Sequence, residues 1–393
     1  MKFIITSLAL IIISQLSYSQ KDTILKTYTQ QELLTDYDLL ILSLKEAHTG
    51  LYWYTTIADF DSLVTNQRAE IKEGMNSYEF FKITSKIVTA TKEGHCRIGS
   101  SRDIGEYFNE KALILPLTVK MLDNKLYILN DIENHKTKGQ VLSKINNIST
   151  VKIIDIILNL TPKYADGNIT TGKIRFSIDY AGLAYYYADF FENKAINKLE
   201  IVNPETNKTS IITANSVSSK MYREIENQIE RPSFNKPIEL NIDKKRNTAH
   251  LSIHSFRYTY YDKEGDEEVV FNLFSSKIDS VFIAIEKAQI DNLIIDIRNN
   301  SGGTEGYEDY VFSYLTNKPY SKYKYVQANS LTFSFLEYAQ YNTPEKQSEF
   351  EKDMENEFYL ENDGRYLRKK EFMTVEPPKE NPFNGKVLCN NFW

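Results

Sequence analysis

The sequence predicts a multi-domain α/β protein, in which a helical N-terminal region precedes a compact β-rich module and an α/β unit. Apolar residues recur at helical spacing over residues 24–92, and short alternating strands begin near residue 112. Beyond residue 237, strands alternate with an amphipathic helix. The length of 393 residues, with 41% hydrophobic and 25% charged residues, is typical of a globular chain of about two to three domains.

The first predicted domain, residues 24–110, is helical. Thr29 to Glu32 forms a capping-box pattern, which favours a helix start. A later helix is predicted to begin at Asn76 or Ser77. The apolar positions that follow these two starts are Leu33, Tyr37, Leu40 and Leu44 for the first, and Phe80, Ile83 and Ile87 for the second.

The second predicted domain, residues 111–215, is rich in short strands around one helix. The helix is capped by Ser149 or Thr150, and a hairpin turns at Asn203–Glu205 before ending near Ile212. The predicted strands are Leu117–Met121, Leu126–Leu129 and Val141–Ile145.

The third predicted domain, residues 236–393, contains a strand–helix–strand unit. Its elements are strands Ile238–Ile242 and Thr248–Phe256, the acidic loop Asp262–Glu268, a helix with apolar positions from Phe271 to Ile285, and a strand at Leu293–Ile295. Because this last strand is apolar on both faces, we expect it to be buried on both sides of a parallel sheet. Residues 318–382 are charged and irregular, which indicates a lid or a surface insertion, and Gly385–Asn390 predicts a final strand.

The glycine pair Gly302–Gly303 follows the Leu293–Ile295 strand directly and precedes a predicted helix. Glycine allows backbone N–H groups to approach a ligand closely, so the pair predicts an anion or oxyanion site, with a purely structural turn as the alternative. The spacing to Gly306 does not match a dinucleotide fingerprint, and the chain has no Walker-type Gly-Lys-Ser/Thr, so nucleotide binding is not predicted.

Five histidines and two cysteines provide the other reactive side chains. His95 follows a glycine in a loop and is a candidate general base. His254 is predicted to be a sheet residue, and His48 either lines an aromatic groove or packs in the core. His135 and His250 are expected at the surface. No pair shows metal-ligand spacing, so neither a metal nor another cofactor is predicted.

The two cysteines bear on disulfide formation, and the net charge bears on the kind of partner. Cys96 and Cys389 could form one bridge or remain free thiols. A net charge of -6 without basic runs argues against nucleic acid as a partner.

Residues 1–19 resemble a signal peptide, with Lys2, an apolar run and a Ser17–Ser19 cleavage pattern; an uncleaved anchor is the alternative. We therefore expect export to the periplasm or the exterior, with no integral membrane segment after cleavage. The oligomeric state is left open.

Four motifs, in a fixed order, resemble the tail-specific (C-terminal processing) serine protease family, in its tricorn-like, exported Bacteroidetes-type branch. Asp296–Gly303 is similar to D-[LIV]-R-x-N-x-G-G, and Lys92–Ile98 is similar to D-G-H-[TS]-x-[LIV], with Glu93 in place of Asp. His48–Tyr52 resembles H-P-x-L-Y, and Gly139–Ser149 resembles the hairpin of PDZ-like domains. The order of the motifs is more specific than any one of them.

The resemblance implies a PDZ-like domain at 111–215 and a crotonase-like α/β protease core at 236–393. It implies a serine-type peptidase acting on protein or peptide substrates by acyl transfer, with Gly302 and Gly303 as oxyanion donors and His95 as general base. The family nucleophile is a serine, assisted by either Lys or His.

Pro382–Leu388 resembles the strand that precedes the family's serine-bearing segment, yet no serine follows Ser348. The nucleophile is therefore expected beyond the chain's end, in a core that is C-terminally incomplete, and the chain as given is expected to be catalytically inactive. Cys389 lies too early to replace it, and Ser301 lies beside the donors. Two alternatives stay open: a non-catalytic PDZ-like pseudoenzyme that binds peptides, and hydrolysis of a non-peptide ester.

Overall fold

The computed structural model describes residues 25–161, 166–191, 194–231, 236–257, 267–298 and 300–390. The signal peptide predicted at residues 1–19, and most of the acidic loop predicted at Asp262–Glu268, lie outside these ranges. The chain divides into two compact units: residues 1–44 with 50–230, and residues 45–49 with 231–393. The helical and β-rich regions predicted as separate domains thus fall in one unit, although each has its own apolar core.

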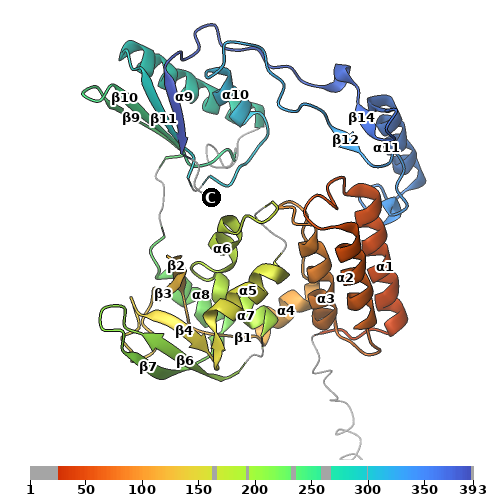
Figure 1. The fold of residues 1–393 in the computed structure, drawn as a ribbon, viewed down its shortest axis with the longest axis vertical. Coiled ribbons are helices and arrows are strands. Elements are labelled where there is room, and N and C mark those ends of the chain that lie inside the picture. The colour runs from red at the N-terminus through yellow and green to blue at the C-terminus, as the bar shows by residue number, and fades with distance from the viewer. Residues whose placement is uncertain are drawn as a thin grey trace, which may run out of the picture. The chain divides into compact units, whose positions relative to one another are not determined.

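Four helices build the N-terminal part of the first unit (Figure 1): α1 Gln30–Ala47, α2 Ile57–Ala69, α3 Ser77–Ala90 and α4 Arg102–Glu110. Both predicted starts are confirmed. Thr29 and Glu32 exchange hydrogen bonds at the start of α1, and Asn76 forms a capping box with Glu79 at the start of α3. α2 and α4 were not predicted. The core of this part is Leu33, Tyr37, Leu44, Leu51, Phe60, Ile71, Ile83 and Ile87.

The Asp103 carboxylate holds three separate segments of this helical part together. It accepts hydrogen bonds from the Ser77 hydroxyl at 2.5 Å, the Ser101 hydroxyl at 2.5 Å and the Lys26 backbone N–H at 2.9 Å. Burial raises the pKa of Asp103, but these hydrogen bonds outweigh burial and lower it to about 2. The ionised carboxylate therefore stabilises the fold.

Asp103→Asn is expected to lower the free energy of unfolding by about 2 kcal/mol near neutral pH. Because the folded-state pKa is depressed, the stabilisation is present above the unfolded-state pKa of about 3.9 and is lost as the pH falls toward about 2. Urea unfolding of both proteins at a series of pH values measures this. Asp155→Asn, at an exposed helix position, is the control; an equal loss in both variants would contradict the role of Asp103.

The β-rich part of the first unit is an antiparallel sheet in the order β2-β3-β4-β6-β7, with β5 paired to β4. Its strands are β2 Val119–Leu122, β3 Lys125–Ile128, β4 Val141–Ile145, β5 Ile148–Ser149, β6 Ile196–Val202 and β7 Thr209–Asn215. The predicted strands, and the hairpin now formed by β6 and β7, are confirmed.

Four helices and a two-stranded ladder complete this part. The helix predicted after Ser149 is α5 Thr150–Leu160, and Ser149 caps it. The remaining elements are α6 Thr171–Ser177, α7 Gly182–Phe190, α8 Ser219–Asn227, and strands β1 Leu113–Ile114 and β8 Val217–Ser218. The sheet packs with α5 and α7 around a single apolar core.

The second unit contains a mixed four-stranded sheet in the order β15-β11-β10-β9. β9 Ile238–Asp243 is antiparallel to β10 Thr248–Ile253, whereas β11 Asn292–Asp296 is parallel to both β10 and β15 Lys386–Asn390. Helices α9 Glu267–Lys287 and α10 Tyr307–Ser313 pack on one face through a shared apolar core. The predicted strand–helix–strand unit and the final strand are confirmed.

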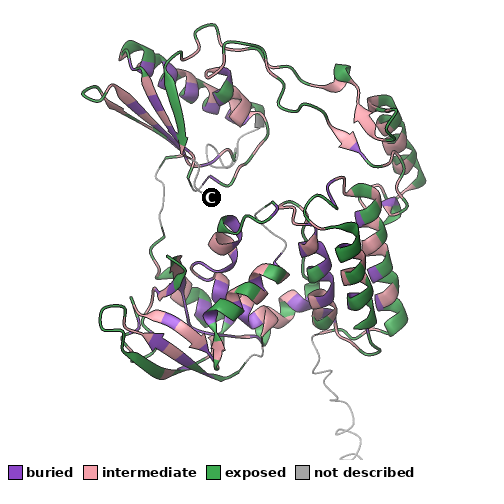
Figure 2. Ribbon diagram, in the orientation of Figure 1, coloured by how far each residue is buried: buried purple, intermediate pink, exposed green. Residues whose placement is uncertain are grey.

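Two details of the predicted sheet were wrong. The Leu293–Ile295 strand is not buried on both faces: Leu293 and Ile295 point into the core, but Ile294 is half-buried, because α9 and α10 pack on the same face. The strand predicted to reach Phe256 ends at Ile253. Figure 2 shows that β15, at the edge of the sheet, is exposed along most of its length.

Residues 318–382 carry little apolar core but are not wholly irregular. They form α11 Pro344–Glu357 and a small sheet in the order β12-β14-β13, with strands β12 Gln327–Ala328, β13 Phe358–Leu360 and β14 Tyr366–Arg368. Two short 3-10 helices are η2 Leu336–Tyr338 and η3 Lys370–Phe372. In the described part of the chain, no helix has both the length and the apolar character needed to cross a membrane.

Candidate functional site

The segment after β11 is held by an ion pair between its own residues. Asp296, at the end of β11, is buried, and the Arg298 guanidinium binds both of its carboxylate oxygens at 2.6–3.1 Å. The Arg298 side-chain hydrogen bonds lower the pKa of Asp296, so the carboxylate is charged. His250 on β10 adds a contact, with its Nε2 3.5 Å from Asp296 Oδ2. The charged pair fixes where the chain leaves the sheet.

Asn300 connects this segment to the neighbouring strand. Its side chain is buried; Nδ2 donates to the carbonyl of Ile253 at the end of β10 at 3.1 Å, and Oδ1 accepts from the Gly302 N–H at 2.8 Å. The amide therefore satisfies backbone groups on both sides of the turn. These two hydrogen bonds explain the asparagine at this position of the turn. Asn300 is part of the sequence motif, but its structural role was not predicted from the sequence.

Gly303 lies against the backbone that follows β10. It forms a parallel bridge with Phe256, supported by Phe256 N–H to Gly302 C=O at 3.3 Å and Thr304 N–H to Phe256 C=O at 3.0 Å. A Cβ at position 303 would lie 2.1 Å from the Phe256 carbonyl carbon. Gly302 has φ +86° with open space around its Cβ position, so it is needed for its backbone angle. The glycine pair therefore has a structural function, independent of the predicted oxyanion role.

The two predicted oxyanion donors differ in availability. The Gly302 N–H already donates to Asn300 Oδ1, so it would have to leave this acceptor to bind a ligand. For the Gly303 N–H, the described residues provide no hydrogen-bond acceptor. Of the pair, the Gly303 N–H would therefore bind an anionic oxygen without first breaking a described hydrogen bond. The predicted donor roles themselves stay predictions.

His95 lies in an ordered loop of the first unit. Its side chain is exposed, and its backbone N–H donates to Glu93 Oε1 at 2.7 Å. The loop is held by Gly94 N–H to Asp166 Oδ1 at 2.7 Å and by Gly167 N–H to the Lys92 carbonyl at 2.8 Å. The general-base role of His95 stays a prediction, because His95 and the glycine pair belong to different units, each of which is described by itself.

The remaining histidines and cysteines have varied surroundings. His254 is largely buried, which lowers its pKa, and its Nε2 lies 4.0 Å from Glu239 Oε2. His135 is half-buried, and the His250 side chain is partly exposed. Cys96 is half-buried and Cys389 is exposed, and each is a free thiol.

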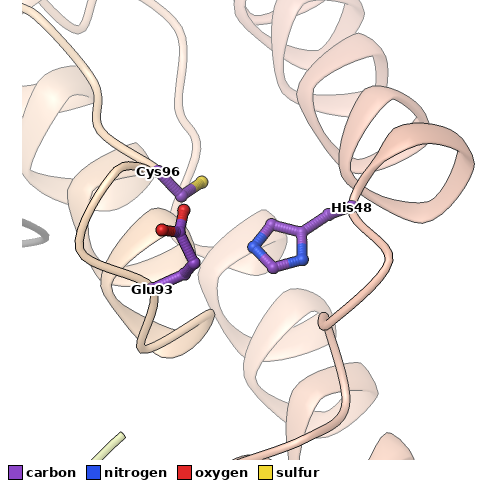
Figure 3. A group of neighbouring side chains, drawn as sticks. All are labelled: His48, Glu93 and Cys96. Atoms are coloured by element: carbon purple, nitrogen blue, oxygen red, sulfur yellow. The ribbon is translucent and has the colours of Figure 1, made fainter. Parts of the chain in front are cut away.

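Three side chains that the sequence did not connect lie together beside α1 and α3. His48 follows α1 directly, and Glu93 and Cys96 come from the loop after α3 (Figure 3). One ligand atom from each residue lies within 4.8 Å of the others, and all three side chains are half-buried. Pattern reasoning missed this group because only Glu93 and Cys96 are close in sequence. The sequence-based expectation of no metal, which rested on spacing alone, stays a prediction, because these three side chains could hold an ion.

Comparison with known proteins gives weak structural matches. No protein-family model matches the chain, and no curated protein matches its sequence. The structure of mature CPAF overlaps 74% of this chain with 14% identity and a TM-score of 0.48; the overlap is 60% of the CPAF chain. The photosystem II D1 C-terminal processing protease overlaps 93% of this chain and 75% of its own, with 8% identity and a TM-score of 0.36.

A Parabacteroides merdae protein, described provisionally as a peptidase, overlaps 93% of this chain and 67% of its own, with 11% identity and a TM-score of 0.38. These TM-scores are too low to establish a shared fold. The assignment of function must therefore rest on the residues of this chain.

Proposed function

We propose that this chain belongs to a serine-type peptidase of the tail-specific kind, which cleaves protein or peptide substrates by acyl transfer. The observation that carries the proposal is the position of the Asp296–Gly303 motif. The motif begins at the carboxyl end of β11, between two parallel neighbours, where open α/β sheets bind their ligands. Export of the protein is part of the same proposal and rests on residues 1–19 alone.

In this proposal the Gly303 N–H binds the developing oxyanion of the substrate carbonyl. Losing one such donor typically slows an enzyme about 10²–10³-fold. Arg298 and Asn300 act as positioning residues, because their hydrogen bonds hold the turn that presents Gly303. His95 removes the proton from the attacking hydroxyl and later gives it to the leaving amine.

The nucleophile is not assigned to a residue described here. Ser301 lies in the same turn as the donors, so its hydroxyl does not face them from across a substrate carbonyl. Cys389 is an exposed residue of β15 whose thiol is only partly shielded from solvent. This partial desolvation, together with the Asp296 charge, raises its pKa and disfavours the reactive thiolate. The proposed nucleophile remains a serine, as in the family that the motifs resemble.

His95→Ala tests the proposal in the gene product that carries these residues. Wild-type protein should cleave unstructured peptides, and His95→Ala should slow cleavage about 10²–10⁴-fold with peptide affinity nearly unchanged, because a general base acts on the chemical step. Mass spectrometry of the products and fluorescence anisotropy of labelled peptides measure the two effects. His135→Ala is the matched control. Cleavage that continues unchanged in His95→Ala would overturn the assignment.

A peptide-binding protein without turnover is the second candidate. The observation that favours it is β7, the outer strand of the antiparallel sheet, which is exposed at most of its positions. An exposed edge strand can bind an extended peptide through backbone hydrogen bonds. In the same experiment, peptide binding without cleavage would support this candidate and exclude the peptidase; neither binding nor cleavage would exclude both.

A further inference from the structure

We propose that His48, Glu93 and Cys96 form a binding site for a zinc-class transition-metal ion. Figure 3 shows the imidazole ring of His48 facing the Glu93 carboxylate and the Cys96 sulfur, with one donor atom from each within 4.8 Å of the others. Zinc holds such ligands at about 2.0–2.3 Å, which places tetrahedral ligand atoms about 3.3–3.8 Å apart. Side-chain rotations that bring the most distant of these atoms closer by about 1 Å would therefore give the ligand spacing of a zinc site.

The His48 imidazole is a second, independent observation. Both of its ring nitrogens are shielded from solvent, and no hydrogen-bond partner for either is found among the described residues. Buried side-chain nitrogens usually have a partner, and a bound ion is one of the few explanations for an exception. A metal bound to one nitrogen would satisfy it, because neutral imidazole is a common metal ligand.

The surrounding fold holds the three residues in place. His48 follows α1 between Leu44 and Leu51, which are both buried in the helical core against which Cys96 also packs. Glu93 Oε1 accepts the His95 backbone N–H at 2.7 Å, which orients the carboxylate while Oε2 remains available for an ion. Such outer contacts orient ligands in known metal sites.

The donor types favour zinc or a similar ion over magnesium and calcium. Thiolate and imidazole are ligands of zinc-class metals, whereas magnesium and calcium require oxygen ligands. A thiolate and a carboxylate together balance the charge of a divalent ion, and three protein ligands leave one coordination position for water or another ligand.

The inference does not depend on the proposed peptidase function, because binding is measured without substrate. The untagged 393-residue chain is freed of metal with a chelator and titrated with Co²⁺, which reports thiolate ligation by charge-transfer absorption, and then with Zn²⁺ as competitor. We expect one Co²⁺ per chain, displaced by Zn²⁺. Cys96→Ser should abolish the absorption. His48→Ala or Glu93→Gln should weaken Co²⁺ affinity by at least about tenfold, because loss of even an outer-shell partner of a metal ligand typically costs about 10–100-fold.

Cys389→Ser is the matched control, because it removes the other free thiol and should keep the absorption. Circular dichroism in chelator checks that each variant is folded. The wild-type chain gives a readout that needs no variant: Zn²⁺ should slow alkylation of Cys96 but not of Cys389, as measured by peptide mass spectrometry. Absence of Co²⁺ binding, absorption that survives Cys96→Ser or disappears in Cys389→Ser, or no protection of Cys96 would each overturn the proposal.

Discussion

Gly303→Ala should lower the free energy of unfolding of the second unit by about 3 kcal/mol, at the upper end of typical overpacking costs. The new methyl group would lie 2.1 Å from the Phe256 carbonyl carbon and 2.3 Å from the Arg257 nitrogen. Both are backbone atoms, so side-chain rotation cannot relieve the collision. The two segments must separate, and the Thr304–Phe256 hydrogen bond is then lost.

Urea unfolding followed by hydrogen exchange in peptides from residues 238–253 and 292–296 measures this loss region by region. Ser301→Ala, at an exposed position in the same turn, is the control and should change stability by less than about 0.5 kcal/mol. Equal stability of the two variants would show that the close approach at Gly303 is not required. The result also matters for catalysis, because Gly303→Ala cannot test the oxyanion role without disturbing the fold.

Phe274→Ala should destabilise the same unit by about 3–5 kcal/mol. Phe274 on α9 is fully buried, and its ring packs against Tyr307 at 4.5 Å and against Phe256 at 6.4 Å between ring centroids. Removing the ring leaves a cavity between α9, α10 and the segment after β10, which the sheet cannot close without moving backbone.

The neighbouring position supplies the control for this prediction. Leu273, on the same helix, is 51% exposed, so Leu273→Ala keeps the helix propensity and removes little buried surface. Its effect should stay within about 0.5 kcal/mol. Limited proteolysis of residues 236–390 should then be faster in Phe274→Ala than in Leu273→Ala; similar rates would show that Phe274 does not anchor the core.

Local signals predicted the helices and strands that depend on neighbours in sequence. Thr29 and Glu32 meet across one helical turn, so their capping box could be recognised from spacing alone. The strand that carries the glycine pair was recognised from its apolar run. Its exposure on one face was not, because the positions of α9 and α10 depend on tertiary packing rather than on the strand itself.

The candidate sites show the same limit. Pattern reasoning identified Gly302 and Gly303 as permissive backbone positions but could not predict that Asn300 uses the Gly302 N–H or that Phe256 lies against Gly303. His48 is separated from Glu93 and Cys96 by two helices, and only the packing of α1 near the end of α3 brings the three together. Sequence spacing therefore could not predict this group of possible metal ligands.

The parallel pairing of β11 with β15 has a consequence for folding kinetics. Asn292 pairs with Lys386, and the chain between them includes α10, α11 and a separate small sheet. Closing so long a loop costs entropy before the ladder forms, so contacts of this kind form slowly. We expect β9, β10, α9 and β11, which are close in sequence, to assemble first and β15 to join last. Substitutions in β15 should accordingly speed unfolding and leave the folding rate nearly unchanged.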